Sequence, residues 1–555
     1  MRIGVAVLLA VELTGCLWAR RMHKAGEIVV NGETRDLRER RAGERPNAPE
    51  TPPLLVLALD GVSRDLLYDM LRSGKLPKLA ILLGGDRLQH AYFDDTLLST
   101  LPSSTMAAWA TAFTGVPPAQ HGVTGNEFFV RETRTFACPA PVSFADATPT
   151  LEIYTDDALD KLADAPTVYE RMRAAASDSL VWVAMSQVYR GADRLILSRR
   201  TAIATAMEGF LESFLVENLT ENTSRQIFET LDNAAIEAVK DQLDDGPVPD
   251  VLTVYLSGTD LYAHTAREGP DAARRAYLTE VIDPAIGRLT DKLRARHALA
   301  NRWVVVTADH GHTEVLRDRM HAIAAGPPDV LRKAGFRIRP FERAVGASDP
   351  FSAVLAYGGA MAYVYLADRS KCPGDADPCP WDQPPRYEDD VLVAAEAFAR
   401  ANETGEGAPS LKGTLDMIFV RRPRPVKEVD LPFEVYIGGG KTMQIDDYLR
   451  DHPHPTYVAV AARMRDLAVG VHGERAGDLL LLAHNGDRDK AEERYYFAAP
   501  YRSWHGSPSR ADSEIPLIVA QPKQRASAIG KRVRRVLGEQ PSQQKVTDVL
   551  LELRR

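Results

Sequence analysis

The sequence lacks the features that mark nucleic-acid-binding, disulfide-built and membrane-embedded proteins. Its 68 lysines and arginines are outnumbered by 76 aspartates and glutamates, so no basic excess is available for binding nucleic acid. Only 4 of the 555 residues are cysteine, which excludes a fold held mainly by disulfides. The apolar stretch after Met1 and Arg2 is too short to cross a bilayer as a stable anchor. What remains is the ordinary composition of a large globular protein, long enough for two or more domains.

Two further patterns are missing. No internal repeat is visible, which excludes solenoid and propeller architectures. The glycine-rich run at residues 438–442 (GGGKT) resembles part of a phosphate-binding loop, but Val435 stands where that loop requires its first glycine. The one basic run, residues 531–535, is short and is interpreted as a solvated helix face.

The N-terminus predicts export. Residues 1–16 have the length and the small-residue exit of a signal peptide, and the final LTGC resembles the bacterial lipobox, in which Cys16 would be lipidated. Glu12 within the apolar run leaves a plain cleaved signal or an uncleaved anchor as alternatives. Residues 17–53, rich in Arg, Glu, Gly and Pro, are expected to be a tether. We therefore expect a periplasmic or outer-membrane-anchored bacterial lipoprotein that meets the membrane only through Cys16.

The other three cysteines are assigned by their spacing. Cys372 and Cys379 bracket a Pro/Gly/Asp loop, and export would make a small local disulfide between them reasonable. Cys138 is expected to be a buried free thiol.

Three apolar runs end in groups that could bind a metal ion. Residues 303–308 predict a strand buried on both faces of a parallel sheet, and they lead to Asp309 and His310. Residues 54–59 repeat this pattern and end at Asp60. Residues 251–256 lead to Asp260 and His264, whose i, i+4 spacing puts both side chains on one face of a helical turn. In open α/β sheets ligands bind outside the carboxyl ends of the strands, so these ends define the candidate site.

A run of hydroxyls comes before a predicted helix. Ser103, Ser104 and Thr105 precede MAAWATAF, so one of them lies at or just before the helix start. It is either an ordinary helix cap or a nucleophile held where the helix dipole and free amide groups stabilise an anion. Residues 180–186 predict another buried strand, with Arg190 just beyond it.

Strands and helices alternate over the first part of the chain, which predicts a mostly parallel α/β sheet. Residues 277–297 predict a covering helix in which Pro284 makes a kink or marks the start. The expected domains are a catalytic core at 54–315, a cap insertion at 316–470 and a second part of the core at 471–555. Short strands are expected in the cap at 360–366, 417–420 and 457–461. Strands are expected in the second part of the core at 479–483 and 515–520. Six acid or imidazole side chains and one hydroxyl are enough for two divalent ions, and these donors suit zinc or a similar ion. They are Asp60, Asp260, His264, Asp309, His310, His505 and a hydroxyl near Thr105.

At this point the sequence resembles the alkaline phosphatase superfamily, and within it the type I phosphodiesterase/nucleotide pyrophosphatase branch. The matching segments, in family order, are LALDG, LPSSTMAAWATAFTGVPPAQHGVTGN, DLYAH, TADHG and HGSPSRADSEIPLIVA. The resemblance implies a three-layer sandwich with helices on both faces of the sheet and an inserted cap. It implies one zinc bound by Asp260, His264 and His505, a second bound by Asp60, Asp309, His310 and Thr105, Thr105 as nucleophile, Asn126 as donor to a phosphoryl oxygen, and substrate binding by Asn126 and Arg190.

The activity implied is hydrolysis of small phosphate esters through a phospho-threonine. In the threonine-using monoesterases of the superfamily a Ser-x-Lys-x-Arg segment grips the phosphate dianion, whereas this chain has Val188 in place of the lysine, between Ser186 and Arg190. Loss of one cation favours a diester or nucleotide pyrophosphate substrate. A monoesterase with the same site is the alternative, and a non-catalytic metal-containing binding lipoprotein is a more distant one. His312 and His484 match no family role and are interpreted as ordinary polar residues.

Overall fold

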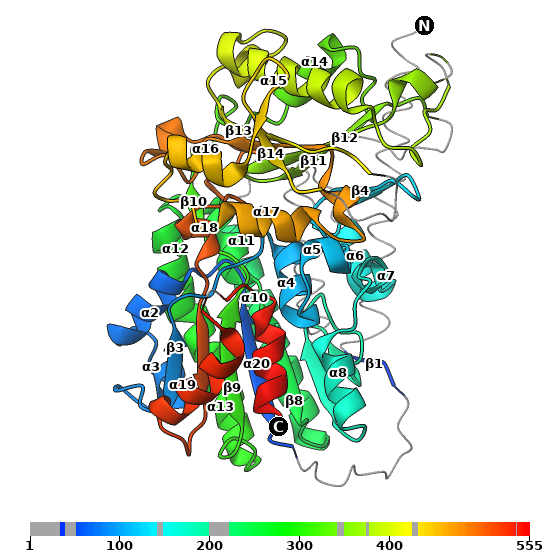
Figure 1. The fold of residues 1–555 in the computed structure, drawn as a ribbon. Coiled ribbons are helices and arrows are strands. Elements are labelled where there is room, and N and C mark those ends of the chain that lie inside the picture. The colour runs from blue at the N-terminus through cyan, green and yellow to red at the C-terminus, as the bar shows by residue number, and fades with distance from the viewer. Residues whose placement is uncertain are drawn as a thin grey trace, which may run out of the picture.

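The structure is a computed structural model. It describes residues 34–38, 51–140, 142, 148–198, 221–340, 349–372, 374, 377–424, 431–539 and 541–555. The predicted signal peptide with Cys16 lies outside these residues. Figure 1 shows two stacked bodies, each built on its own sheet. None of the helices in the described ranges is both long and apolar enough to span a membrane.

The first body contains an eight-stranded sheet whose five central strands, β7, β6, β8, β2 and β9, run parallel. Strands β1 and β18 pair antiparallel with their neighbours, and β3 is antiparallel to β18. The predicted mostly parallel sheet is thus confirmed. Part of the expected tether is strand β1. The order across the sheet is β1 (Thr34–Asp36), β7 (Arg194–Ile196), β6 (Val181–Ala184), β8 (Val251–Leu256), β2 (Leu54–Leu59), β9 (Trp303–Ala308), β18 (Leu517–Ala520) and β3 (Ala91–Asp94).

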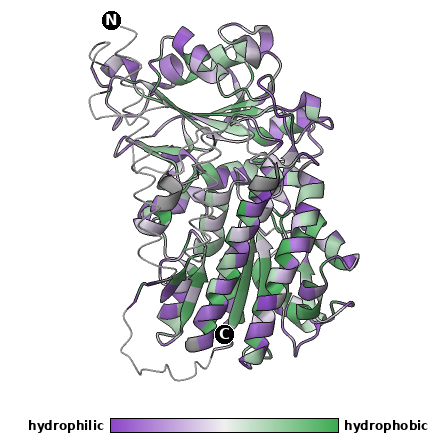
Figure 2. Cartoon of the chain, turned by 180° about the vertical axis from the view of Figure 1, so that it is seen from behind, coloured by the Kyte–Doolittle hydropathy of each residue, from purple (hydrophilic) through white to green (hydrophobic). Residues whose placement is uncertain are grey.

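Alternate residues of β2 explain why the sheet carries helices on both faces. Leu55, Leu57 and Leu59 pack into one apolar cluster, while Leu54 and Val56 pack into another on the opposite face. Figure 2 shows hydrophobic strands between helices whose hydrophilic residues face outward. The first face is covered by α2 (Arg64–Arg72), α3 (Pro77–Leu82), α10 (Glu221–Asp245), α12 (Pro270–Tyr277) and α13 (Asp283–Ala295), and the second by α4 (Thr105–Thr114), α8 (Val168–Ala175), α19 (Ala526–Leu537) and α20 (Lys545–Leu553).

Smaller elements complete the first body. The predicted helix at 277–297 begins as a π-helical turn (Leu278–Ile282), and Pro284 lies in the first turn of α13, as expected. Helix α11 (Gly258–Thr265) follows β8 directly. The other elements are α5 (Pro118–His121), β4 (Phe128–Val130), β5 (Thr135–Ala137), α6 (Thr148–Thr155), α7 (Ala158–Leu162) and α18 (Arg510–Ser513).

The second body is an antiparallel six-stranded sheet with helices on both faces. Helices α14 (Gly326–Lys333) and α15 (Leu392–Thr404) cover the outer face, while α16 (Ile445–Asp451) and α17 (Val460–Ala468) lie toward the first body (Figure 1). The strand order is β11 (Ala353–Gly358), β12 (Met361–Leu366), β16 (Leu479–Ala483), β13 (Leu415–Val420), β14 (Glu434–Tyr436) and β15 (Thr442–Met443).

Two predictions about this body are wrong. The strand at 479–483, assigned to the catalytic core because it is a continuous apolar run, is β16 and lies between β12 and β13, buried on both faces by the helices of the second body. The expected strand at 457–461 is absent: Tyr457 makes a single bridge with Ser509, residues 458 and 459 lie in no helix or strand, and α17 begins at Val460. Apolar runs of this length do not distinguish the two sheets or the two conformations.

The second body joins the first where two short strands pair. Strand β10 (Thr313–Glu314), just after the catalytic strand β9, is antiparallel to β17 (Ser503–Trp504), where the chain returns. The chain therefore leaves and re-enters the first body at neighbouring points.

The cysteine predictions are confirmed in one case and corrected in the other. Cys372 and Cys379 form the expected disulfide. Cys138 is a free thiol, but it is half-buried rather than buried.

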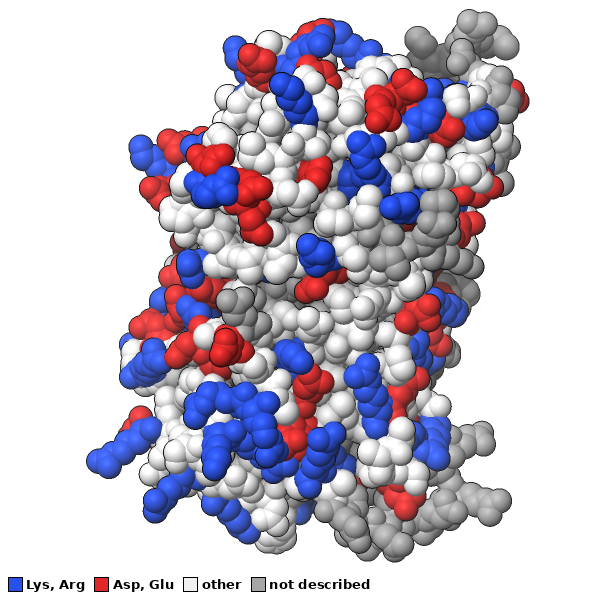
Figure 3. Space-filling view, in the orientation of Figure 1, with Lys and Arg blue, Asp and Glu red and all other residues white. Residues whose placement is uncertain are grey.

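The surface carries side chains of both charges. On the face shown in Figure 3, basic and acidic side chains are interspersed over the upper part, whereas lysine and arginine side chains gather over the lower part. The basic run at 531–535 lies on α19, where Arg532 and Arg535 bond to Glu552 of α20.

Asp232 of α10 fixes the start of α11, and its titration is testable. It accepts from the backbone N–H groups of Ser257 and Gly258 and from the hydroxyl of Tyr277. Burial raises the pKa of Asp232 from 3.8 to about 7. The folded state therefore holds this proton more tightly than the unfolded state, and stability falls as pH rises from 4 to 7. In the metal-free protein, Asp232→Asn should reduce this slope by up to about 1.4 kcal/mol per pH unit, measured by urea unfolding. Asp244→Asn on the exposed face of α10 is the control, and an equal slope in both variants would contradict the assignment.

Candidate metal centre

The carboxyl ends of three adjacent parallel strands supply most of the site. Asp60 follows β2, Asp309 follows β9, and α11, which follows β8, carries Asp260 and His264. The strands are in register, with Leu59 level with the ends of both neighbours. Because β2 lies between β8 and β9, the side chains at their tips come together.

The first ligand set is Asp60, Asp309 and His310. One ligand atom from each lies within 4.8 Å of the others. His310 Nε2 is 3.3 Å from Asp309 Oδ2 and 3.6 Å from Asp60 Oδ1. Thr105 Oγ1 lies 3.2 Å from the same Nε2 atom. The structure thus brings the predicted nucleophile to this set.

The second ligand set is Asp260, His264 and His505, again within 4.8 Å of one another. Asp260 Oδ1 lies 3.4 Å from His264 Nε2 and 3.9 Å from His505 Nε2. The rings of His310 and His505 stack with their centroids 3.6 Å apart, so the two sets adjoin.

Backbone carbonyls fix the orientation of these histidines. The Nδ1 atoms of His264, His505 and His310 lie 2.7, 2.8 and 3.0 Å from the carbonyl oxygens of Ser503, Ser103 and Gly311, respectively. A carbonyl only accepts, so each Nδ1 carries the hydrogen and each Nε2 keeps its lone pair for a metal ion.

Burial and charge show that the site fits cations. Asp60 Oδ1, Asp260 Oδ1 and Asp309 Oδ2 are buried and make no hydrogen bond within the part of the chain that is described. Burial, followed by the charges of Asp309 and Asp260, raises the pKa of Asp60 well above its usual range. Carboxylate oxygens without donors, opposite imidazole lone pairs, are the environment that a divalent cation satisfies.

The structure adds two residues that the sequence interpretation missed. His312 is buried, with Nε2 2.8 Å from Asp260 Oδ1 and Nδ1 3.1 Å from the hydroxyl of Ser503; burial lowers the pKa of His312 to about 3. The hydroxyl of Tyr255 donates to the second oxygen of Asp60. The alternation of His310 and His312 in an extended segment was a usable signal for the first, because alternate residues share a face.

Thr105 and Asn126 lie together at the start of α4. Thr105 is the first residue of the helix, follows Ser104, and is 8% exposed. Asn126 Oδ1 accepts from the Met106 backbone N–H at 2.9 Å. That bond orients the carboxamide, because its oxygen is taken and its Nδ2 group remains available to donate.

The Arg190 guanidinium is engaged by neighbouring groups of the first body. Its guanidinium bonds to Glu170 and to the carbonyls of Asp160, Ala163 and Ala165. Val188 is buried in the apolar cluster of the first body instead of standing at the site. These contacts do not support the predicted substrate role of Arg190, which stays a prediction, as does the inference about substrate charge drawn from Val188.

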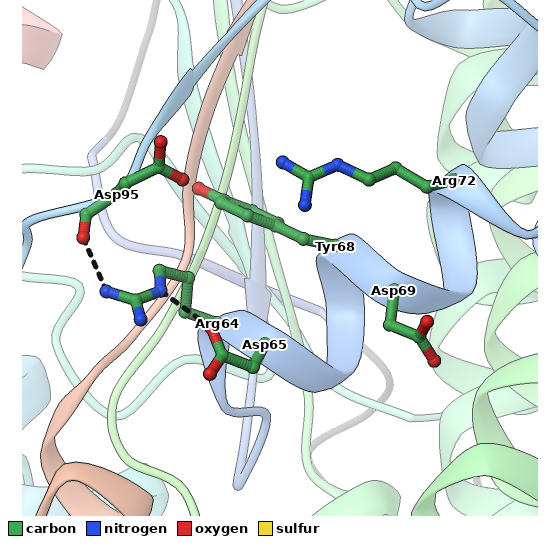
Figure 4. A pocket seen from close by; sticks show the side chains of 6 residues that line it. All are labelled: Arg64, Asp65, Tyr68, Asp69, Arg72 and Asp95. Atoms are coloured by element: carbon green, nitrogen blue, oxygen red, sulfur yellow. Dashed lines mark hydrogen bonds and ion pairs between the residues drawn. The ribbon is translucent and has the colours of Figure 1, made fainter.

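A solvent-facing cavity of about 280 Å³ lies apart from these ligands, over α2 (Figure 4). It is lined by Arg64, Asp65, Tyr68, Asp69, Arg72 and Asp95. Arg64 is paired with Asp65 and with the carbonyl of Asp95. None of the metal-ligand candidates contributes to it.

A mainly parallel α/β sheet with two adjoining Asp/His sets at its carboxyl edge defines a candidate metalloenzyme of the alkaline phosphatase type. The chain belongs to the type I phosphodiesterase/nucleotide pyrophosphatase family, whose model matches residues 54–374. That family lies within the alkaline phosphatase superfamily and consists of hydrolases that act on phosphoric esters, typically with divalent metal ions.

Individual relatives are distant. An uncharacterized pyrophosphatase/phosphodiesterase of Schizosaccharomyces pombe is 24% identical over 269 residues, which are 48% of this chain and 46% of that protein. The match thus spans about half the length of the curated relative. Murine ectonucleotide pyrophosphatase/phosphodiesterase 5, solved alone and as an inactive variant in complex with AMP, is 12% identical at a TM-score of 0.47, covering 90% of this chain and 94% of the murine one.

Removing one buried carboxylate should have opposite effects with and without metal. In chelator at pH 8, Asp60→Asn should raise the thermal midpoint, because the folded state no longer buries that charge. The gain should shrink toward pH 4, where the raised pKa leaves Asp60 protonated in the wild type. In excess zinc the variant should melt lower than the wild type, because a ligand is lost. Asp164→Asn, at an exposed position, is the control, and a lower midpoint for Asp60→Asn in chelator would contradict the explanation.

The placement of Arg190 has a kinetic consequence. Arg190→Ala should leave the KM for bis-p-nitrophenyl phosphate within about twofold of wild type, because its contacts are with carbonyls of the first body. Asn126→Ala, measured alongside, should impair turnover. A tenfold rise in KM for Arg190→Ala, with unchanged zinc content and thermal midpoint, would restore the substrate role.

Proposed function

We propose that this protein is an exported two-metal hydrolase that cleaves phosphodiesters or nucleotide pyrophosphates through a phospho-threonine at Thr105. The observation that carries the proposal is the position of the Thr105 hydroxyl, at the first residue of a helix and 3.2 Å from His310 Nε2. The family supports phosphoric ester hydrolysis in general.

The ligand assignments follow the two sets. Asp60, Asp309 and His310, with Thr105, would hold one ion, and Asp260, His264 and His505 would hold the other. When bound, two such ions would lower the pKa of the Thr105 hydroxyl and neutralise the negative charge of the phosphoryl group. Imidazole and carboxylate donors in equal number favour zinc over magnesium, which prefers all-oxygen sites.

The rest of the chemistry falls to groups of the chain itself. The Thr105 hydroxyl is positioned to attack phosphorus, displacing an alcohol or a nucleotide, and water then hydrolyses the phospho-threonine. Asn126 Nδ2 and backbone N–H groups at the start of α4, other than the Met106 N–H that bonds to Asn126 Oδ1, would donate to the phosphoryl oxygens as negative charge grows on them. The buried position of Thr105 limits competing attack by solvent.

Substrate class and location are parts of the same proposal. The preference for diesters is supported by family membership, and a small phosphate ester is the expected partner. Export, and lipidation at Cys16, are supported by the N-terminal sequence. The catalytic body comprises the chain up to β10 and from β17 onward, and the second body is proposed as the cap.

The direct test is a pair of hydrolysis rates on zinc-loaded protein, with p-nitrophenyl phosphate and bis-p-nitrophenyl phosphate. We expect a preference for the diester. Thr105→Ala should abolish turnover, Thr105→Ser should retain part of it, and Asn126→Ala should reduce kcat by about 10²–10³-fold, as loss of one oxyanion donor does.

Zinc content measured on the same samples separates the outcomes. A preference for the monoester would replace the substrate class and keep the site. Wild-type activity in Thr105→Ala would overturn the nucleophile, and zinc binding without turnover of either ester would favour the binding-protein alternative.

A further inference from the structure

Four potential metal ligands gather in the second body, away from the catalytic sets. Asp416 lies in β13 where its pairing with β16 shifts register. His454 follows α16, and His484 and Asp487 lie just after β16. One ligand atom each from Asp416, His454 and Asp487 lies within 4.8 Å of the others.

Two distances in this cluster match those between ligands of one ion. Asp416 Oδ1 is 3.5 Å from His454 Nε2 and 3.6 Å from His484 Nδ1, both too long for a good hydrogen bond. Atoms that each lie about 2.1 Å from a tetrahedral zinc ion are about 3.4 Å apart. Asp416 Oδ1 is therefore spaced from each of the two imidazole nitrogens as ligands of one ion are. His484 Nδ1 lies 2.7 Å from Asp487 Oδ2, a hydrogen bond that a bound ion would replace.

Two buried carboxylates make the cluster favourable for a cation. The side chains of Asp416 and Asp487 are only 4% and 5% exposed. Burial, and then the charge of Asp487, raises the pKa of Asp416. Asp487 is also bonded by Arg488, whose side chain is 41% exposed and therefore has room to turn aside. The ion pairs of Asp416 in the described chain are those with His454 and His484.

We propose that Asp416, His454, His484 and Asp487 form a third divalent-metal site, of zinc type, separate from the catalytic pair. Two carboxylates and two imidazoles are a tetrahedral zinc donor set. Both histidines are 16% exposed, so an ion has a route from solvent.

The position of this site indicates its role. The Tyr457 hydroxyl donates to Asp416 Oδ2, and Tyr457 bridges to Ser509. Next to Tyr457, Val458 donates its N–H to the Pro508 carbonyl. The loop at 484–488 also packs closely against Ser509, because a Cβ atom added at Gly486 would clash with the Ser509 side chain. An ion at the cluster therefore braces the segment that follows His505.

The test counts ions in the full-length protein. Chelated protein is saturated with zinc, freed of unbound metal by gel filtration and measured by mass spectrometry of the metal. His454→Gln and Asp416→Asn should each hold one zinc per chain fewer than wild type. His452→Gln, at the exposed end of α16, should match wild type. Equal zinc content in all four proteins would overturn the proposal.

A thermal measurement guards against misfolding of the variants. In chelator, His454→Gln should melt close to the wild type, because without the ion the substitution removes a stacking contact with Tyr457 and a 3.5 Å approach to Asp416. Added zinc should raise the wild-type midpoint more than that of the variant, and an equal rise would also overturn the proposal. The outcome is independent of the catalytic assignment, since Thr105→Ala should lose turnover and keep this zinc.

Discussion

The burial of three carboxylates at one edge of the sheet is the constraint on which the rest of the structure depends. Asp60, Asp260 and Asp309 stand within one cluster, and each has an oxygen without a donor. Such a group is costly unless cations balance it. This need for cations explains why histidines with fixed orientation surround the carboxylates and why the Thr105 hydroxyl lies beside them.

Segments from distant parts of the chain hold the metal-ligand candidates and the turn before Thr105 in place. Ser503 holds His264 through its carbonyl and His312 through its hydroxyl, and Ser103 holds His505. Arg463 of α17, a buried cation whose pKa burial lowers to about 9, donates to the Thr100 carbonyl and the Ser103 hydroxyl. The second body therefore supports the turn that carries the nucleophile, in addition to lying over the site.

The ligands at the ends of the parallel strands could be predicted from sequence. A buried parallel strand is a continuous apolar run, and the polar residues that end it follow directly in the sequence. Asp60, Asp309 and the Asp260–His264 pair follow from that rule alone. His505 and Thr105 needed the family resemblance, since neither follows a strand of this kind. The contacts of the Arg190 guanidinium with the carbonyls of Asp160, Ala163 and Ala165 could not be predicted, because the sequence gives no sign of them. Strand β16 was misassigned because an apolar run does not reveal which of two sheets will pair with it.

The pairing of β10 with β17 makes the second body modular. An excursion whose two ends already meet in a two-stranded ladder can be shortened, replaced or enlarged with little change in the first body. The catalytic residues before Thr313 and after Ser503 would keep their places while the covering structure changed. Evolution of new substrate ranges in such a scaffold would then proceed by exchange of the covering body, provided that Ser503 remains to hold its two histidines and that a donor equivalent to Arg463 still holds the turn before Thr105.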